Sequence, residues 1–487
     1  MNYKFIFALV ATILITSCKS NQTTDPSEEI NTIENGLLKS LQVKGESPIN
    51  LNILDRMAHH KVPGVSIAIV ENGVIKWAKA YGIANTNTGQ EVDINTLFQA
   101  GSISKPLAAL SALKLVEEGK LDLDKDVNSY LKNWKIPDSK FTETEKVTLR
   151  RLLTHTAGMT VHGFPGYTQK DSFPSIEMVL NGKGNTSAIF VDTIPGSIWR
   201  YSGGGYTVME KLVEDVSELP LEDYMIKNIL VPMQMSNSTY DQPLLKSRYA
   251  NASAAYYGDG TIVEGLWHNY PEQAAAGLWT TPTDLAKYCI EIQNIITDKK
   301  KGVLSKDIVE QMLSKDKNNW GLGPSLRWEN DSLIFQHGGK NAGFTNDLMA
   351  FAYSGNAVVV MTNADNGGKL IGEILRSVSQ YYNWGTHQTK IVETISLPIE
   401  DLGKFTGTYK LDFQVPDIGD YLIDISIKDK KLFVMDPNND DSNVLTPQNA
   451  LKFIDLDKGD EVEFQTTDDA KIGLLWSGRF QFYKVEE

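Results

Sequence analysis

The sequence predicts an α+β domain, in which helices flank an antiparallel sheet, followed by a small all-β domain. The chain has 487 residues, more than one hydrophobic core usually organises, so two folded domains are expected. Strand patterns stand near both ends of residues 48–385, with helical patterns between them. Residues 398–487 differ in texture, because short strand patterns alternate there with turns.

The first domain begins with a helix followed by a hairpin. A helix is expected over residues 51–57, ahead of a buried apolar strand over residues 65–70. The turn residues Glu71-Asn72-Gly73 join that strand to a second one over residues 74–81. We expect this hairpin to form part of the central sheet.

The middle of the domain is expected to be helical and the end to return to strands. A turn at Gly101-Ser102 begins a helix over about residues 103–118. Residues 160–197 are rich in Gly, Pro and Phe without lasting periodicity, which indicates long loops with short helical pieces. Strands at 347–353 and 357–362 form a second hairpin, so the antiparallel sheet is expected to unite both ends of the domain.

The second domain has its own charge and strand pattern. Strands are expected at 422–427, 431–435 and 461–465. Residues 400–487 carry 19 acidic and 10 basic side chains, a net of −9 out of −14 for the whole chain. These features predict a small β-barrel or sandwich.

The overall composition narrows the class of protein. Hydrophobic residues make up 41% and charged residues 22%, as in ordinary globular proteins. The net charge of −14 comes without a basic stripe, so nucleic acid is not expected as a partner. Small-molecule chemistry stays open.

The N-terminus has the layout of a secretory signal. An apolar run from Phe5 to Ile15 follows Lys4 and is too short for a comfortable membrane span. Thr16-Ser17-Cys18 resembles the lipobox of bacterial lipoproteins, in which the cysteine is diacylated. We therefore expect residues 1–18 to be a signal peptide, Cys18 to be the lipidation site, and the protein to be anchored in the cell envelope. The alternative is a plain signal peptide with an incidental cysteine.

Neither residues 19–47 nor the second cysteine, Cys289, is expected to take part in catalysis. The segment 19–47 is polar and is expected to be mainly a tether between membrane and enzyme, with a short helix near Leu37 to Leu41. Cys289 lies in a helical pattern and is expected to be a buried apolar residue, not a reactive thiol.

Four Ser-x-x-Lys tetrads place a hydroxyl and an amine one helical turn apart, so that the amine can take the hydroxyl proton. Ser111 lies inside a helix pattern, and Ser129 and Ser314 lie among exposed polar residues. Ser102 alone stands where a turn leads into a helix. There the free N–H groups and the helix dipole favour developing negative charge, so Ser102 is the candidate nucleophile.

The tetrad at Ser102 resembles the first motif of the superfamily of class C β-lactamases, D,D-peptidases and related esterases. The resemblance covers about Pro48 to Trp384 and implies a β-lactamase/transpeptidase-like domain. Phe405-x-Gly407-x-Tyr409 is similar to the opening of β domains appended to some serine hydrolases. Five segments agree with the superfamily in order and spacing: Ser102-Ile103-Ser104-Lys105, Leu152 to Gly158, Pro195-Gly196 through Tyr201-Ser202-Gly203, Gly277 to Leu285, and His337-Gly338-Gly339.

The resemblance implies a role for each matched residue. Ser102 would attack a carbonyl, while Lys105 and Tyr201 would share its proton, each through a lowered pKa. The backbone N–H groups of Ser102 and of Lys340, just after Gly339, would form the oxyanion hole. His337 would orient the tyrosine or the substrate. The alternatives are that Tyr201 is a core aromatic and that His337 bonds a loop. His155 is expected to be structural.

Two departures from the family pattern direct the choice of substrate. Gly203 replaces an asparagine that binds the substrate amide in β-lactamases, and His337 replaces a lysine that helps to bind the β-lactam carboxylate. Both favour a broader serine hydrolase acting on a small-molecule or peptide acyl substrate: an esterase, a D-amino-acid peptidase or an amidase. The alternatives are a β-lactamase or penicillin-binding D,D-carboxypeptidase proper, and a binding lipoprotein without turnover. No cofactor or metal is expected, because no metal-site or nucleotide-binding motif is present.

Overall fold

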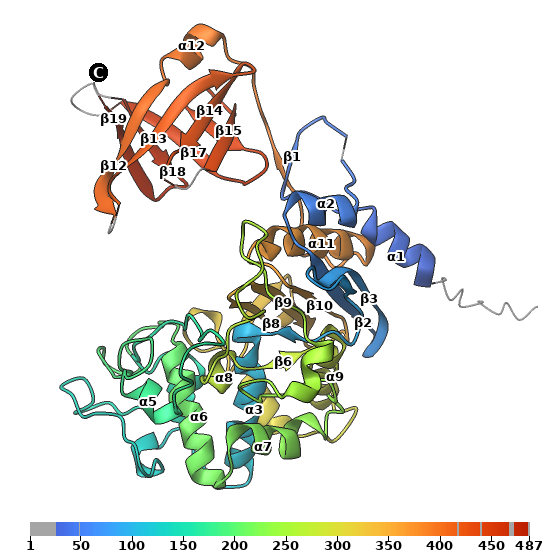
Figure 1. Ribbon diagram of the computed structural model, residues 1–487, viewed down its shortest axis with the longest axis vertical. Coiled ribbons are helices and arrows are strands. Elements are labelled where there is room, and N and C mark those ends of the chain that lie inside the picture. The colour runs from blue at the N-terminus through green and yellow to red at the C-terminus, as the bar shows by residue number, and fades with distance from the viewer. Residues whose placement is uncertain (1–25, 48, 416–417, 439–440, 467–471, 486–487) are drawn as a thin grey trace, which may run out of the picture.

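Two folded units follow each other along the chain, a sheet-and-helix unit and a closed barrel (Figure 1). The computed structural model describes residues 26–47, 49–415, 418–438, 441–466 and 472–485. Cys18 and the rest of the expected signal peptide lie outside the described residues. Within the described part of the chain, no helix combines the length and the apolar character that crossing a membrane requires.

The centre of the first unit is a seven-stranded antiparallel sheet in the order β4-β3-β2-β10-β9-β8-β7. Strand β2 pairs with β10, so the start and the end of the unit meet in the middle of the sheet, as predicted. Both predicted hairpins are present. The strands are β2 (Gly64–Glu71), β3 (Val74–Asn85), β4 (Gln90–Glu91), β7 (Ser325–Glu329), β8 (Ser332–Asn341), β9 (Phe344–Phe351) and β10 (Ala357–Thr362).

Helices cover both faces of this sheet, because its inner strands are apolar on both sides. Val65, Ile67 and Ile69 of β2 join one core, and Ala68 and Val70 join the other. The first core is shared with α1 (Pro26–Glu34), α2 (Ile53–His59) and α11 (Gly367–Tyr381). The second is shared with α3 (Ser104–Glu117), α4 (Leu149–Leu153), α5 (Ile176–Leu180), α6 (Gly203–Ser217), α7 (Leu221–Met225), α8 (Gln273–Ala276), α9 (Pro282–Ile296) and α10 (Lys306–Met312). Cys289 is fully buried in α9.

The expectation of a tether is wrong for residues 26–47. Helix α1 packs against α11 and buries Ile33, and Trp77 Nε1 donates a hydrogen bond of 2.9 Å to the buried Glu29 carboxylate. Residues 37–41 form no helix; Leu37 bridges to Leu51 instead, and β1 (Leu41–Val43) pairs in parallel with β11 (Lys390–Val392). A few apolar anchors within a polar stretch are enough to dock it, and the average polarity of the segment hides them.

The C-terminal unit is a barrel and not a sandwich. Eight strands follow one another around it, and β12 closes it by pairing with β19. The short helix α12 (Ile399–Gly403) lies at one end, away from the first unit (Figure 1). The strands are β12 (Gly407–Val415), β13 (Gly419–Lys428), β14 (Lys431–Asp436), β15 (Asp441–Pro447), β16 (Lys452–Asp455), β17 (Glu461–Thr466), β18 (Ile472–Trp476) and β19 (Phe480–Lys484).

Candidate active site

Ser102 lies in the short 3-10 turn η1 (Gly101–Ile103), which leads directly into α3. The edge of β8 lies against this turn. A Cβ atom on Gly101 would stand 2.5 Å from the backbone nitrogen of Lys340, and one on Gly339 only 1.9 Å from the carbonyl oxygen of Ala100. Glycine at both positions lets the two backbones touch, so Gly339 and Lys340 lie beside the Ser102 turn.

The β8 edge beside Ser102 has no strand partner on its β7 side beyond Gln336 among the described residues. The pairing of β7 with β8 ends at Gln336, while β9 continues to pair with β8 as far as Asn341. Residues 337–341 therefore have a described strand partner on one side only. Backbone groups on the open side of such an edge are suited to bind a substrate carbonyl or peptide.

The amine of Lys105 faces the Ser102 hydroxyl. Lys105 Nζ donates to Ser102 Oγ at 3.0 Å and to the carbonyl oxygen of Ala275, in α8, at 2.8 Å. Lys105 is buried, and burial lowers its pKa from 10.5 to about 7. A substantial fraction of this amine is therefore neutral near pH 7 and able to accept a proton.

Tyr201 also reaches Ser102, but its acidity is shifted the other way. It stands just before α6, and its phenol lies close enough to Ser102 for the serine hydroxyl to influence its acidity. Burial raises the pKa of Tyr201 well above 10, and the nearby Ser102 hydroxyl offsets only part of that shift. The expectation of a lowered tyrosine pKa is thus contradicted. The phenol keeps its proton near neutrality and is suited to donate or relay it.

His337 completes the group of predicted side chains. Its ring centroid lies 6.2 Å from that of Tyr201. Burial, together with the nearby Lys105, lowers the pKa of His337 to about 3, so the ring is neutral at physiological pH. Its Nδ1 lies 2.6 Å from the carbonyl oxygen of Gly338, and its buried Nε2 has no hydrogen-bond partner among the described residues.

The rings of His155, His162 and Trp320, which the sequence did not single out for catalysis, lie around Tyr201. The His155 ring lies 4.2 Å from the Tyr201 ring, and its Nδ1 accepts the backbone N–H of Ser202. The Trp320 ring lies 5.8 Å from Tyr201 and 5.4 Å from Trp199. His155 was expected to tie a loop, which it does. The two tryptophans come from separate loops, and no local spacing in the sequence links them to the motifs.

The structure also accounts for the glycine at position 203. A Cβ atom on Gly203 would lie 2.9 Å from the ring of Phe164 and 3.0 Å from the carbonyl oxygen of His162. The loop 160–164 therefore occupies the space that a side chain would need. An amide at this position would require the loop to move, so the site lacks the polar group that β-lactamases have there.

The described residues contain no candidate metal site. In that part of the chain no group of three or more His, Cys, Asp or Glu side chains is placed to hold a metal ion. Ser102, Lys105, Tyr201, His337, Gly339 and Lys340 are thus brought together around one turn, while Cys18 lies outside the described residues.

Comparison with known proteins places this site in context. Residues 49–377 match the Beta-lactamase family. Protein flp of Staphylococcus aureus (strain MW2) is 25% identical over 313 residues, which are 63% of this chain and 60% of that protein. The chain therefore spans less than two thirds of the length of this curated relative.

Two solved structures share the fold. The octameric penicillin-binding protein homologue from Pyrococcus abyssi superposes with a TM-score of 0.61 at 22% identity, covering 89% of this chain and 98% of that one. The D-amino acid amidase from Ochrobactrum anthropi SV3, complexed with L-phenylalanine amide, gives a TM-score of 0.57 at 18% identity over 73% of this chain and 99% of that one. Sequence identities this low show only that the fold is shared.

Proposed function

Because this chain belongs to the Beta-lactamase family, we propose that it is a serine hydrolase in which Ser102 forms an acyl-enzyme. One observation carries the proposal: the buried amine of Lys105 lies 3.0 Å from Ser102 Oγ and has a pKa lowered to about 7. A base matched to neutral pH and within hydrogen-bond reach of a hydroxyl is the requirement for activating a serine. A purely binding protein has no need for it.

The proposed reaction begins with proton transfer from Ser102 to the neutral Lys105 amine. Ser102 Oγ attacks the substrate carbonyl carbon, and the oxyanion accepts hydrogen bonds from the backbone N–H groups of Ser102 and Lys340. The carbonyl re-forms as the bond to the leaving group breaks. The Tyr201 phenol donates its proton to that group and regains one from the protonated Lys105. Water then attacks the acyl-enzyme by the reverse route and releases Ser102 and the acid.

The substrate proposed is an ester or an amide of a small acyl group, in the manner of an esterase, a D-amino-acid peptidase or an amidase. Two features support this choice over β-lactam hydrolysis. His337 is neutral and offers no positive charge to a β-lactam carboxylate, and the Phe164 ring and the His162 carbonyl of the 160–164 loop fill the space at Gly203. The shared fold with a D-amino acid amidase is consistent with the amide class.

We also propose that the hydrolase works outside the cytoplasm, attached to the membrane through a lipid on Cys18. The support is the apolar run that ends in Thr16-Ser17-Cys18. The anchor would hold the enzyme in the cell envelope, where peptide and amino-acid esters or amides of the wall would be its accessible substrates.

Steady-state turnover tests the proposal. Purified protein is assayed with p-nitrophenyl acetate, D-phenylalanine amide and nitrocefin, a chromogenic β-lactam. We expect hydrolysis of the ester or the amide and little of nitrocefin. Ser102→Ala should abolish the turnover, whereas Ser314→Ala, which alters an exposed Ser-x-x-Lys tetrad, should leave it intact. Nitrocefin hydrolysed faster than the other two would favour a β-lactamase. Ester or amide turnover unaffected by Ser102→Ala would contradict the proposed nucleophile.

A further inference from the structure

The C-terminal barrel is filled unevenly along its axis. At the end that carries α12, the rings of Phe405 and Phe464 stack at 4.2 Å, and Phe453 lies 5.4 Å from Phe464. Tyr409 is fully buried among them, 6.1 Å from Phe464. Leu402 of α12 is buried against the same cluster. Close aromatic packing of this kind fills the space between these rings, and a smaller cavity of about 340 Å³ lies beside them, lined by Asp401, Phe405 and Phe464 among others.

The opposite end contains a cavity of about 430 Å³. Phe413, Trp476 and Phe480 line it, all at positions whose side chains point inward, because alternate residues of a strand face the same side. Phe413 is 50% exposed and Phe480 is 40% exposed. Large rings that point into a barrel and still meet solvent show that the interior is open at this end. Small eight-stranded barrels can hold one ligand in such a space.

Two carboxylates stand in the wall of the same cavity. Asp436 accepts hydrogen bonds from the Tyr421 hydroxyl and from both the backbone N–H and the side-chain amide of Asn438. Asp460 accepts from the Ser477 hydroxyl at 3.1 Å and from the Asn443 amide at 3.4 Å. All of these donors are neutral, so these hydrogen bonds do not themselves cancel the negative charge of either carboxylate. The Lys458 ammonium is close by and donates to the Asn443 amide oxygen at 3.2 Å.

We propose that this open end of the barrel binds a small amphipathic molecule, with its apolar body among Phe413, Trp476 and Phe480 and a cationic head at Asp436 and Asp460. The net charge of −9 over residues 400–487 disfavours an anionic ligand of the same shape. The volume lies within the range of small-molecule sites. This binding site is separate from Ser102, and its occupancy does not require that Ser102 be catalytic.

Three detergents with a common dodecyl chain test the proposal by titration calorimetry of the purified protein below their critical micelle concentrations. The cationic dodecyltrimethylammonium should bind about tenfold more tightly than dodecyl sulfate, the scale expected from two partly exposed carboxylates. The neutral dodecyl maltoside should lie between them. Asp436→Asn with Asp460→Asn should reduce the difference between the charged probes while retaining binding of the maltoside.

Variants of the apolar cavity wall test where the dodecyl chain of the probes binds. Val415→Trp, which fills the mouth, and Phe480→Ser, which removes part of the wall, should each weaken all three probes. Tyr483→Ser, on the outer face of β19, is the matched control for Phe480→Ser. This variant and Ser102→Ala should both bind the three probes as the native protein does. Near-ultraviolet circular dichroism checks that each barrel stays folded.

Three results would overturn the proposal: no saturable binding of any probe, binding unchanged in both folded wall variants, or tightest binding of the sulfate. Phosphatidylcholine vesicles provide a further arm. Suppose that the protein sediments with the vesicles, that Phe480→Ser abolishes this sedimentation, and that none of the monomeric probes binds. The barrel end would then dock on a lipid surface, and this result also contradicts a small-molecule site.

Discussion

At the scale of single residues, the two groups next to Ser102 divide the proton chemistry between them. Burial lowers the pKa of the Lys105 amine to about 7 and raises that of the Tyr201 phenol, because in each case the charged form loses its hydration. The lysine is thereby made available as a base near neutrality. The tyrosine is kept protonated, so it acts as a donor in the proposed mechanism.

The first prediction is a pH profile that follows from these shifts. The active form of Lys105 is neutral, so kcat/KM should rise with pH and level off above about pH 7. A descending limb from Tyr201 is expected only above the ordinary tyrosine range, because its pKa is raised. Ester hydrolysis is followed from about pH 5 to 9, with Ser102→Ala subtracted as background. A profile that stays flat across this range would contradict a titrating lysine base.

The second prediction concerns the Tyr201 hydroxyl. Tyr201→Phe keeps the ring and its packing against His155 but removes the group that carries the proton, so kcat should fall by about a hundredfold or more. Tyr206→Phe is the matched control. Its ring also lies near Lys105, at 5.8 Å, but its buried hydroxyl donates to the carbonyl oxygen of Leu153. That variant should lose about 1 kcal/mol of stability and little rate. Equal rate losses in both variants would show that Tyr201 acts only through packing.

The sequence identified the nucleophile through context, and the structure shows why the tetrad alone was not enough. The hydroxyls of Ser111, Ser129 and Ser314 donate to carbonyl oxygens of their own helical turns, whereas Ser102 faces its lysine. The direction of the tyrosine pKa shift was missed. It depends on how deeply the phenol is buried by residues distant in sequence, such as Trp320, and no local pattern encodes that.

At the scale of elements, the site depends on a backbone contact between the η1 turn and β8. Gly101 and Gly339 permit it, since a Cβ on either would overlap the other segment. The contact holds the backbone nitrogen of Lys340 beside Ser102, where the proposed oxyanion hole lies. Sequence motifs mark both segments, but they do not reveal that the two backbones touch.

The third prediction tests this contact. Gly339→Ala places a methyl group 1.9 Å from the Ala100 carbonyl oxygen, so β8 must move away. A shift of about 1 Å is enough to cost roughly a hundredfold in rate. Gly338→Ala on the same strand is the control, because its Cβ would meet nothing closer than 3.8 Å. Acylation rates with a fluorophosphonate probe provide the measurement, and similar rates in the two variants would contradict the role assigned to the contact.

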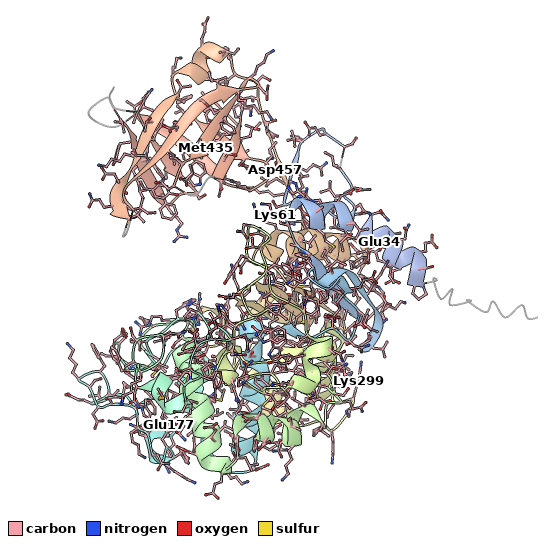
Figure 2. The ribbon with its side chains drawn as sticks, viewed as in Figure 1. Glu34, Lys61, Glu177, Lys299, Met435 and Asp457 are labelled. Atoms are coloured by element: carbon pink, nitrogen blue, oxygen red, sulfur yellow. The ribbon has the colours of Figure 1, made fainter. Side chains whose placement is uncertain are left out.

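Helices and strands were predicted well where a strong periodicity of apolar residues coincided with clear turn signals. The helix after Ser102 and both hairpins of the sheet are cases of this kind. Helix α1 was missed because its sequence is polar on average, and only a few side chains anchor it. Glu29 is buried against Trp77, and Glu34, at the end of α1 in Figure 2, pairs with Lys79 at 2.6 Å. Such tertiary contacts override local composition.

At the scale of the whole molecule, the described contacts of the barrel include the N-terminal segment. Strand β1 pairs with β11, just ahead of the barrel. Lys39 forms an ion pair with Asp457, which Figure 2 shows on the side of the barrel nearest β1, and Lys390 pairs with Glu461 at 2.8 Å. The segment expected to be a tether thus connects the proposed lipid anchor to both folded units.

The fourth prediction concerns that anchor. If Cys18 is the lipidation site, globomycin should cause an unprocessed precursor to accumulate, and Cys18→Ala should abolish incorporation of labelled palmitate. Cys289→Ala is the matched control and should leave acylation unchanged, because that thiol is buried. Native protein recovered in the cytosol without lipid would contradict the proposal.

The central claim is that Ser102 carries the acyl group, and the fifth prediction tests it directly. The protein is treated with a fluorophosphonate, and the modified peptide is sequenced by mass spectrometry. We expect one adduct per chain, located on Ser102, formed far more slowly in Lys105→Ala and absent in Ser102→Ala. An adduct on a different serine, or ester turnover at the native rate in a Ser102→Ala protein, would contradict the account.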